Sequence, residues 1–116
     1  MADGAKMLAK KMTEITVNDI PDDILHESSR TLINMLAVSL SASNDKPVQA
    51  LIRWVQNEGA TPRASIVGSN LRTSLNNAAL LNGYMAHLHD YDDTHFPTVL
   101  HPTAPVWPAV LALAEY

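Results

Sequence analysis

The spacing of apolar residues constrains this chain most, because it follows a helical period almost everywhere. Residues 48–55 show the period most clearly, with apolar side chains at the i, i+3, i+4, i+7 positions of one helix face. The same spacing predicts helices over residues 5–12, 24–40 and 75–89, and a last helix that begins between residues 105 and 108 and runs to residue 116. Only residues 64–68 (ASIVG) look strand-like, and we interpret them as an extended connector or an edge strand.

Turn-forming residues separate these helices. Pro21, followed by two aspartates, is typical of a helix start, and Gly59 stands where a C-terminal cap glycine is expected. Residues 90–103 carry turn formers and two prolines, so we expect a loop there. We therefore predict an all-α fold, a helical-bundle-like domain over residues 1–116 with at most one short extended segment.

The helix predicted over residues 24–40 is apolar nearly all round at its C-terminal end. Leu36, Ala37 and Leu40 fall on one side, and Met35 and Val38 fill the other. A helix that is apolar on all sides is normally buried on all sides. We therefore expect the rest of the domain to enclose these last turns.

Composition and charge limit the class of protein. The chain has 116 residues, 47% of them hydrophobic, which suits one modest domain with a real core. The net charge of −4 and the lack of a basic stripe argue against a nucleic-acid partner. Without cysteine there is no disulfide, no thiolate metal site and no cysteine nucleophile. Because there is no signal-peptide pattern and no run of roughly 18 apolar residues, we expect a cytoplasmic protein without a membrane partner.

The last predicted helix lacks a stop signal. No Gly, Asn or basic last turn follows its apolar pattern, and the chain ends within that pattern. We therefore expect these 116 residues to be a fragment, or a truncated product, of something longer.

Titratable side chains are concentrated in one stretch. Four of the five histidines fall there, with three aspartates among them: His87, His89, Asp90, Asp92, Asp93, His95 and His101. All lysines and arginines precede residue 73. Clustered carboxylates without a nearby cation need water, a metal ion, histidines or a cation from elsewhere in the fold.

Three interpretations of this stretch are open. In the first, it binds a metal ion, but His87 and His89 are two residues apart and point to different sides of a helix. In the second, a histidine beside carboxylates moves protons as a general acid or base. In the third, the aspartates and histidines only cap helices and fix the turn. Since no known metal-binding spacing is present, we predict no metal ligands.

The same stretch resembles the signature region of the MmgE/PrpD family. Six segments carry the resemblance: residues 77–83 (NAALLNG), 86–87 (AH), 90–95 (DYDDTH), 101–102 (HP), 104–105 (AP) and 109–115 (AVLALAE). Residues 31–37 resemble the family's first long helix, and residues 64–68 its short extended stretch. The resemblance covers the chain from about residue 10, and DxDDTH followed five residues later by HP is its most specific part.

This resemblance implies a chemistry and an assembly. Family members combine a large helical domain with a smaller α/β domain and are typically homodimers. They act on small polycarboxylates by proton transfer, without a redox cofactor or a required metal. We therefore expect a parent activity of dehydrating a 2-methylcitrate-like hydroxy-polycarboxylate, with no cofactor. Decarboxylation of cis-aconitate and epimerisation of a related dicarboxylate are the alternatives.

The resemblance also implies roles for individual residues. By motif match, His101 would transfer the proton, Asp90 would orient it or a neighbouring group, and Thr94 would hydrogen-bond the substrate or a catalytic side chain. His95 and Asp93 would lie close enough to contact the substrate.

The family takes its basic and tyrosine substrate-binding groups from sequence that this chain does not contain. We therefore expect the 116-residue chain to be inactive by itself. A competing hypothesis is a truncated, non-catalytic interaction module. Two positions depart from the family pattern: His89 replaces an apolar residue, and Tyr91 replaces a phenylalanine.

Overall fold

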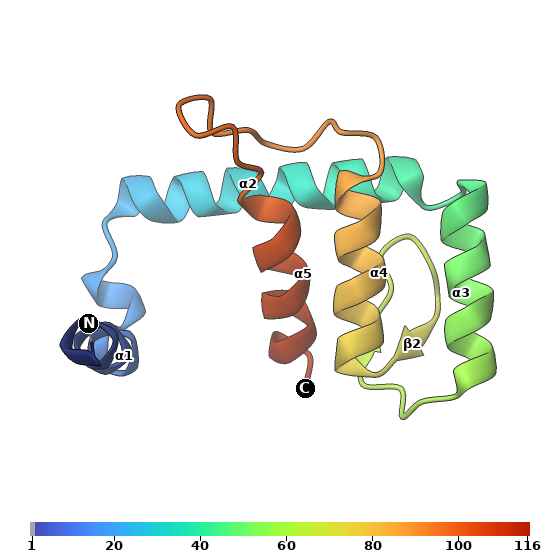
Figure 1. Cartoon of the computed structure of the whole chain (residues 1–116), viewed down its shortest axis with the longest axis horizontal. Helices are drawn as coiled ribbons and strands as arrows, with labels where there is room; N and C mark the ends of the chain where they lie inside the picture. The colour runs from blue at the N-terminus through green and yellow to red at the C-terminus, as the bar shows by residue number, and fades with distance from the viewer. Residues whose placement is uncertain (1) are drawn as a thin grey trace. The chain divides into compact units, whose positions relative to one another are not determined.

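A computed structural model describes residues 2–116 and confirms the predicted helical fold (Figure 1). In chain order the elements are α1 (Ala2–Glu14), the 3₁₀ helix η1 (Val17–Asp19), α2 (Asp22–Ala42), α3 (Lys46–Glu58), β1 (Ala64–Ser65), β2 (Arg72–Thr73), α4 (Leu75–His87) and α5 (Thr103–Ala114). They form two compact units, Met1–Arg30 and Thr31–Tyr116. No helix of the described residues is long and apolar enough to cross a membrane.

The first unit is built from short local interactions. Helix α1 is longer than predicted and leaves apolar side chains such as Met7 and Leu8 exposed. After it, the hydroxyl and the backbone N–H of Thr16 donate to Asp19 Oδ2 at 2.7 and 2.9 Å. These two hydrogen bonds stabilise the charged carboxylate and lower the pKa of Asp19. The hydrogen bond from the hydroxyl makes the larger contribution.

Three helices of the second unit stand next to one another. Figure 1 shows α3, α4 and α5 in this order from right to left, with the β1–β2 hairpin beside α3 and α4. Residues 31–42 of α2 contribute Met35 and Val38 to a core that also contains Ala86 of α4 and Ala104 of α5. A second core joins α3, the hairpin and α4 through side chains such as Val48, Ile66 and Met85, with the end of α2.

The prediction that the end of α2 is enclosed on all sides was wrong. Its buried residues are Met35, Val38, Ser39 and Ala42, which follow i, i+3, i+4, i+7 and so form one face. Leu40, on another face, is 53% exposed. The helix therefore packs against the rest of the unit through one face, and its remaining apolar residues lie outside the core.

The strand-like stretch does form a strand, and its partner was not predicted. Strand β1 pairs antiparallel with β2, with Ala64 opposite Thr73. The chain turns at Gly68, which has a φ of 76°, a backbone conformation that glycine adopts with little strain. A Cβ added there would lie 2.7 Å from Ser43 Cβ, so the turn also needs glycine for space.

Asn82 of α4 holds the hairpin against the helix. Its side-chain oxygen accepts from Val67 N at 2.9 Å, and its nitrogen donates to Ser65 O at 3.0 Å. The residue is 3% exposed and both bonds are partly buried, so leaving them unmade is costly.

Helix α4 ends earlier and helix α5 begins earlier than predicted. These two helix ends position the stretch of titratable residues. Helix α4 stops at His87, two residues early, and α5 begins at Thr103, ahead of the predicted start. The two helices pack closely, since a Cβ added at Gly83 would lie 3.4 Å from Ala104 O. The connecting loop therefore starts and ends at two helices that pack against each other.

We predict that Asn82→Ala lowers the free energy of unfolding by about 1–3 kcal/mol, because it removes the side-chain partner of two partly buried backbone groups. The matched control is Asn76→Ala, an exposed position of the same helix, which should change stability by less than about 0.5 kcal/mol. Urea unfolding followed by circular dichroism measures both values. Equal losses in the two variants would contradict the role of Asn82.

Candidate functional site

The loop between α4 and α5 brings together two histidines. His87 lies at the end of α4, and His101 lies two residues before α5 begins. Their rings are 4.9 Å apart between centroids and meet edge to face. Asp90, at the start of the loop, has a left-handed backbone with φ of 52°, a conformation that aspartate adopts more readily than most residues.

The carboxylate of Asp92 lies between these two rings. Its side chain is 0% exposed. Its Oδ1 atom is 3.0 Å from His87 Nδ1 and 3.2 Å from His101 Nδ1. An ionised carboxylate can only accept, so the His87 contact places a hydrogen on Nδ1 of that ring.

Asp90 approaches the opposite side of the His101 ring. Its Oδ1 atom lies 3.8 Å from His101 Nε2, and its side chain is 78% exposed. His101 therefore has a carboxylate near each ring nitrogen. One donor atom from each of His87, Asp90, Asp92 and His101 lies within 4.8 Å of the others, and we call these four residues the His/Asp cluster.

The cluster leaves polar atoms without hydrogen bonds. Asp92 Oδ2 and His101 Nδ1 are both buried and have no hydrogen-bond partner among residues 2–116. His101 Nδ1 is close enough to Asp92 Oδ1 for a charge interaction, but the direction of the contact does not make it a hydrogen bond. A buried carboxylate oxygen without a donor is unusual, because desolvation is costly.

The other predicted site residues lie around this cluster. The Thr94 hydroxyl donates to the Asp92 carbonyl at 3.5 Å, and so reaches the backbone of the cluster. Asp93 accepts from Thr103 Oγ1 at 2.5 Å, which ties the loop to the first residue of α5. His95 is exposed and its Nδ1 lies 2.7 Å from Thr98 Oγ1, within the loop and outside the cluster.

His87 and Asp92 are the members of the cluster that the motif comparison did not assign. Both lie in the stretch where titratable residues gather and within the segments that resemble the family, but the resemblance implied no role for them. His89, two residues from His87, contacts a different partner; it lies beyond the end of α4 and not on the helix as predicted. Its Nε2 lies 2.6 Å from Asp45 Oδ2, just before α3.

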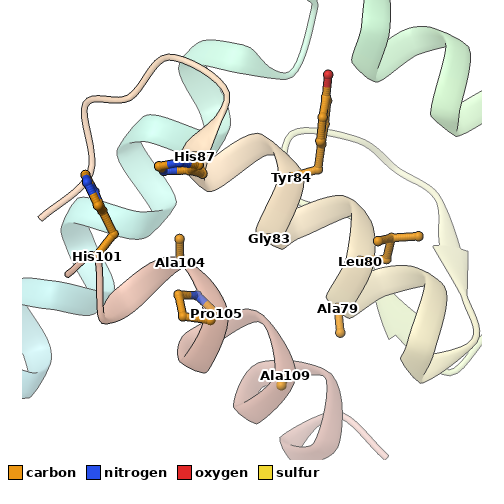
Figure 2. A pocket seen from close by; sticks show the side chains of 9 residues that line it. All are labelled: Ala79, Leu80, Gly83, Tyr84, His87, His101, Ala104, Pro105 and Ala109. Carbon is orange, nitrogen blue, oxygen red and sulfur yellow. The ribbon is translucent and has the colours of Figure 1, made fainter.

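A cavity opens beside the cluster, between α4 and α5. It has a volume of about 530 Å³, and Figure 2 shows His87 and His101 at one end of it. The rest of the wall is apolar or small: Ala79, Leu80, Gly83, Ala104, Pro105 and Ala109, with Tyr84 at the rim. Small residues on both helices leave this space open, so the cluster lies at the end of an apolar cavity.

Positive charge near the cluster comes only from histidines. Within residues 2–116, every ion pair of Asp90 and Asp92 is made with His87 or His101. Arg72, the last arginine of the sequence, pairs with Glu115 at 3.1 Å. A negatively charged ligand therefore finds no lysine or arginine of this region beside the cluster.

The fold and the cluster define a helical domain with paired imidazoles and carboxylates at a cavity, an arrangement suited to acid–base chemistry. The sequence places it among known proteins. Residues 6–116 match the MmgE/PrpD N-terminal domain, and the chain belongs to this family.

Three similar proteins are all named for the same activity. A cis-aconitate decarboxylase-like protein, oryM, of Aspergillus oryzae is 29% identical over 93% of this chain and 22% of its own length. The cis-aconitate decarboxylases of Mus musculus and Homo sapiens are 26% and 25% identical, each over 94% of this chain and 24% of their own length. The chain thus spans less than a quarter of the curated relatives it matches.

We predict that Thr103→Val lowers the free energy of unfolding by about 1–3 kcal/mol, because the part-buried Asp93 carboxylate loses the side-chain donor that it has within the described part of the chain. Thr98→Val is the control, since it removes an exposed contact of the same loop and should cost less than about 0.5 kcal/mol. Thermal and urea unfolding measure both. A Thr103 variant as stable as the wild type would show that this bond does not hold the loop.

Proposed function

We propose that this chain forms the acid–base part of a lyase that acts on small polycarboxylates. The observation that carries the proposal is His101, which has one carboxylate near each ring nitrogen and lies at the end of a cavity. The names of the three relatives support the substrate class.

The reaction best supported by those names is decarboxylation of a cis-aconitate-like substrate. The bond between carbon and the leaving carboxylate breaks, and carbon dioxide departs. The electron pair moves into the carbon framework, and a general acid delivers one proton to carbon. A protonated His101 supplies this proton, and solvent restores it after each turnover.

The two aspartates have separate tasks in this proposal. Asp92, buried and in contact with both imidazoles, fixes the orientation of the His101 ring. Asp90, exposed at the other ring nitrogen, balances the positive charge of the imidazolium and faces solvent. Thr94, bonded to the Asp92 carbonyl, holds the loop and offers its hydroxyl to the substrate.

A polycarboxylate also needs cations, which neutralise it most effectively as bidentate arginines or as lysines. The cluster has none among the described residues. We therefore propose the activity for a protein of the relatives' length that contains this segment, and homodimer formation is part of the same proposal.

Dehydration of a 2-methylcitrate-like hydroxy-polycarboxylate is the second candidate. It uses the same cluster in the opposite sense, because a neutral His101 removes the proton α to a carboxylate and hydroxide leaves with a proton from an acid. The apolar cavity wall beside His101 favours this candidate, since a methyl-bearing substrate fits such a wall. The product separates the two: decarboxylation releases carbon dioxide, and dehydration does not.

We predict that His101→Ala, in a full-length protein containing this segment, lowers kcat by about 10²–10⁴-fold with a smaller change in KM, because proton transfer is lost and binding groups remain. His26→Ala, an exposed change in the first unit, is the control and should leave kcat unchanged. Consumption of cis-aconitate, followed by ultraviolet absorbance, gives both constants. A loss below about threefold in the His101 variant would exclude it as the proton donor.

We predict that the 116-residue chain alone neither forms nor consumes cis-aconitate-type double bonds, because no lysine or arginine of residues 2–116 pairs with the cluster to help hold the substrate. The same absorbance assay tests this, with the full-length protein as the positive control. Turnover by the isolated chain would show that the His/Asp cluster needs no further groups.

A further inference from the structure

A histidine outside the His/Asp cluster connects the end of α4 to the junction between α2 and α3. His89 Nε2 lies 2.6 Å from Asp45 Oδ2, and His89 Nδ1 lies 3.3 Å from Ser41 Oγ. Ser41 belongs to the last turn of α2, and Asp45 directly precedes α3. We call His89, Asp45 and Ser41 the His89 bridge.

Both contacts of the His89 bridge can be made in either form of the imidazole. A carboxylate only accepts, so His89 Nε2 carries the hydrogen that points to Asp45. The Ser41 hydroxyl donates to Val38 O at 2.8 Å, which leaves its oxygen free to accept from Nδ1 of a charged ring. When the ring is neutral, the hydroxyl can turn and donate to Nδ1. The bridge therefore does not depend on the protonation of His89.

The Asp45 carboxylate takes part in the bridge and not in capping its own helix. Asp45 is the N-cap residue of α3, where an aspartate side chain usually accepts from the first N–H groups of the helix. Among the described residues, its side chain makes no capping hydrogen bond and contacts His89 instead. The carboxylate is therefore available to hold the histidine.

The residues around His89 carry the cluster. His87 ends α4, and Leu88 packs against the core formed by α3, the hairpin and α4. Asp90 follows with its left-handed φ of 52°, and its N–H donates to His87 O at 3.0 Å. A strained backbone of this kind persists only where the surrounding structure holds it. Packing of Leu88 and the His89 bridge supply that support immediately before Asp90.

We propose that His89 is a positioning residue for the His/Asp cluster and that it acts through its contact with Asp45. The bridge fixes the turn at the end of α4, and this turn sets where the Asp90 carboxylate lies relative to the His101 ring. Asp90 needs such a constraint, because its side chain is 78% exposed and its Oδ1 lies 3.8 Å from His101 Nε2, too far for a hydrogen bond. The effect on catalysis rests on the proposed function, whereas the effect on the geometry of the cluster does not.

Nuclear magnetic resonance of the 116-residue chain tests the positioning without substrate. His89→Leu removes the bridge at a side chain that is 41% exposed, and circular dichroism checks that the variant is folded. We expect the His101 ring nitrogens to shift and the Asp90 amide to exchange about tenfold faster, because the turn opens more often. Asp45→Ser breaks the bridge from its other end but keeps a favourable helix N-cap, and it should reproduce both changes.

Two further variants separate the bridge from a general effect. His89→Gln keeps an amide donor that reaches toward Asp45, and it should restore most of the wild-type behaviour. Lys46→Ala removes an exposed charge next to Asp45 but leaves the bridge in place, so it should change neither readout. Unchanged His101 resonances and Asp90 exchange in a folded His89→Leu chain would overturn the proposal. A His89→Gln chain as perturbed as His89→Leu would do the same.

Turnover gives a readout that a purely structural role would not change. In a folded full-length protein containing this segment, His89→Leu should lower kcat about tenfold and leave KM within about twofold, because a misplaced group slows the reaction more than it weakens binding. His89→Gln should recover most of the loss, and an unchanged kcat in His89→Leu would overturn the positioning role. An unaltered full-length protein without lyase activity would contradict the proposed function alone, and the spectra would then decide whether His89 positions the cluster.

Discussion

The buried carboxylate of Asp92 is the constraint around which the functional part of this chain is arranged. Removing an ionised group from water costs several kcal/mol unless partners compensate for it. Here the partners are His87 and His101, which come from the end of one helix and the residues before the next. To supply them, α4 must stop at His87 and the chain must turn back at Asp90. The position of the charged group therefore fixes the course of the loop.

Close packing of α4 and α5 gives the cluster its surroundings. Glycine and alanine on the facing sides bring the helices together near Gly83 and Ala104 but leave a cavity of about 530 Å³ along their length. The cavity ends at the two imidazoles, so an apolar wall and an acid–base cluster share one space (Figure 2). Elsewhere the fold supports this pair, because Asn82 ties α4 to the hairpin and Trp107 Nε1 of α5 donates to Thr31 Oγ1 at 3.0 Å.

The sequence predicted the helices well because one-sided apolar spacing is a local property. It did not predict β2, since two residues, Arg72 and Thr73, are too few to show alternation and their pairing depends on the turn at Gly68. It also predicted too much burial at the end of α2, because apolar residues around the whole helix do not reveal which of them meet a neighbour.

For the site, the sequence located the stretch but not the contacts within it. The family motif indicated His101 and Asp90, which the structure brings near each other. It included His87 but assigned it no role, because the approach of His87 to His101 depends on the path of the intervening loop. Likewise, Asp92 is buried and Asp90, two residues away, is exposed, although both are aspartates. Long-range geometry of this kind is absent from local patterns.

The most direct test of this account is whether Asp92 joins the two imidazoles in solution. Long-range ¹H–¹⁵N correlation spectra report the ring nitrogens of each histidine in the 116-residue chain. With Asp92→Asn, the account predicts large shifts of the His87 and His101 ring nitrogens, while those of His26 stay in place. Unchanged His87 and His101 resonances in a folded Asp92 variant would contradict the cluster, and with it the proposed site.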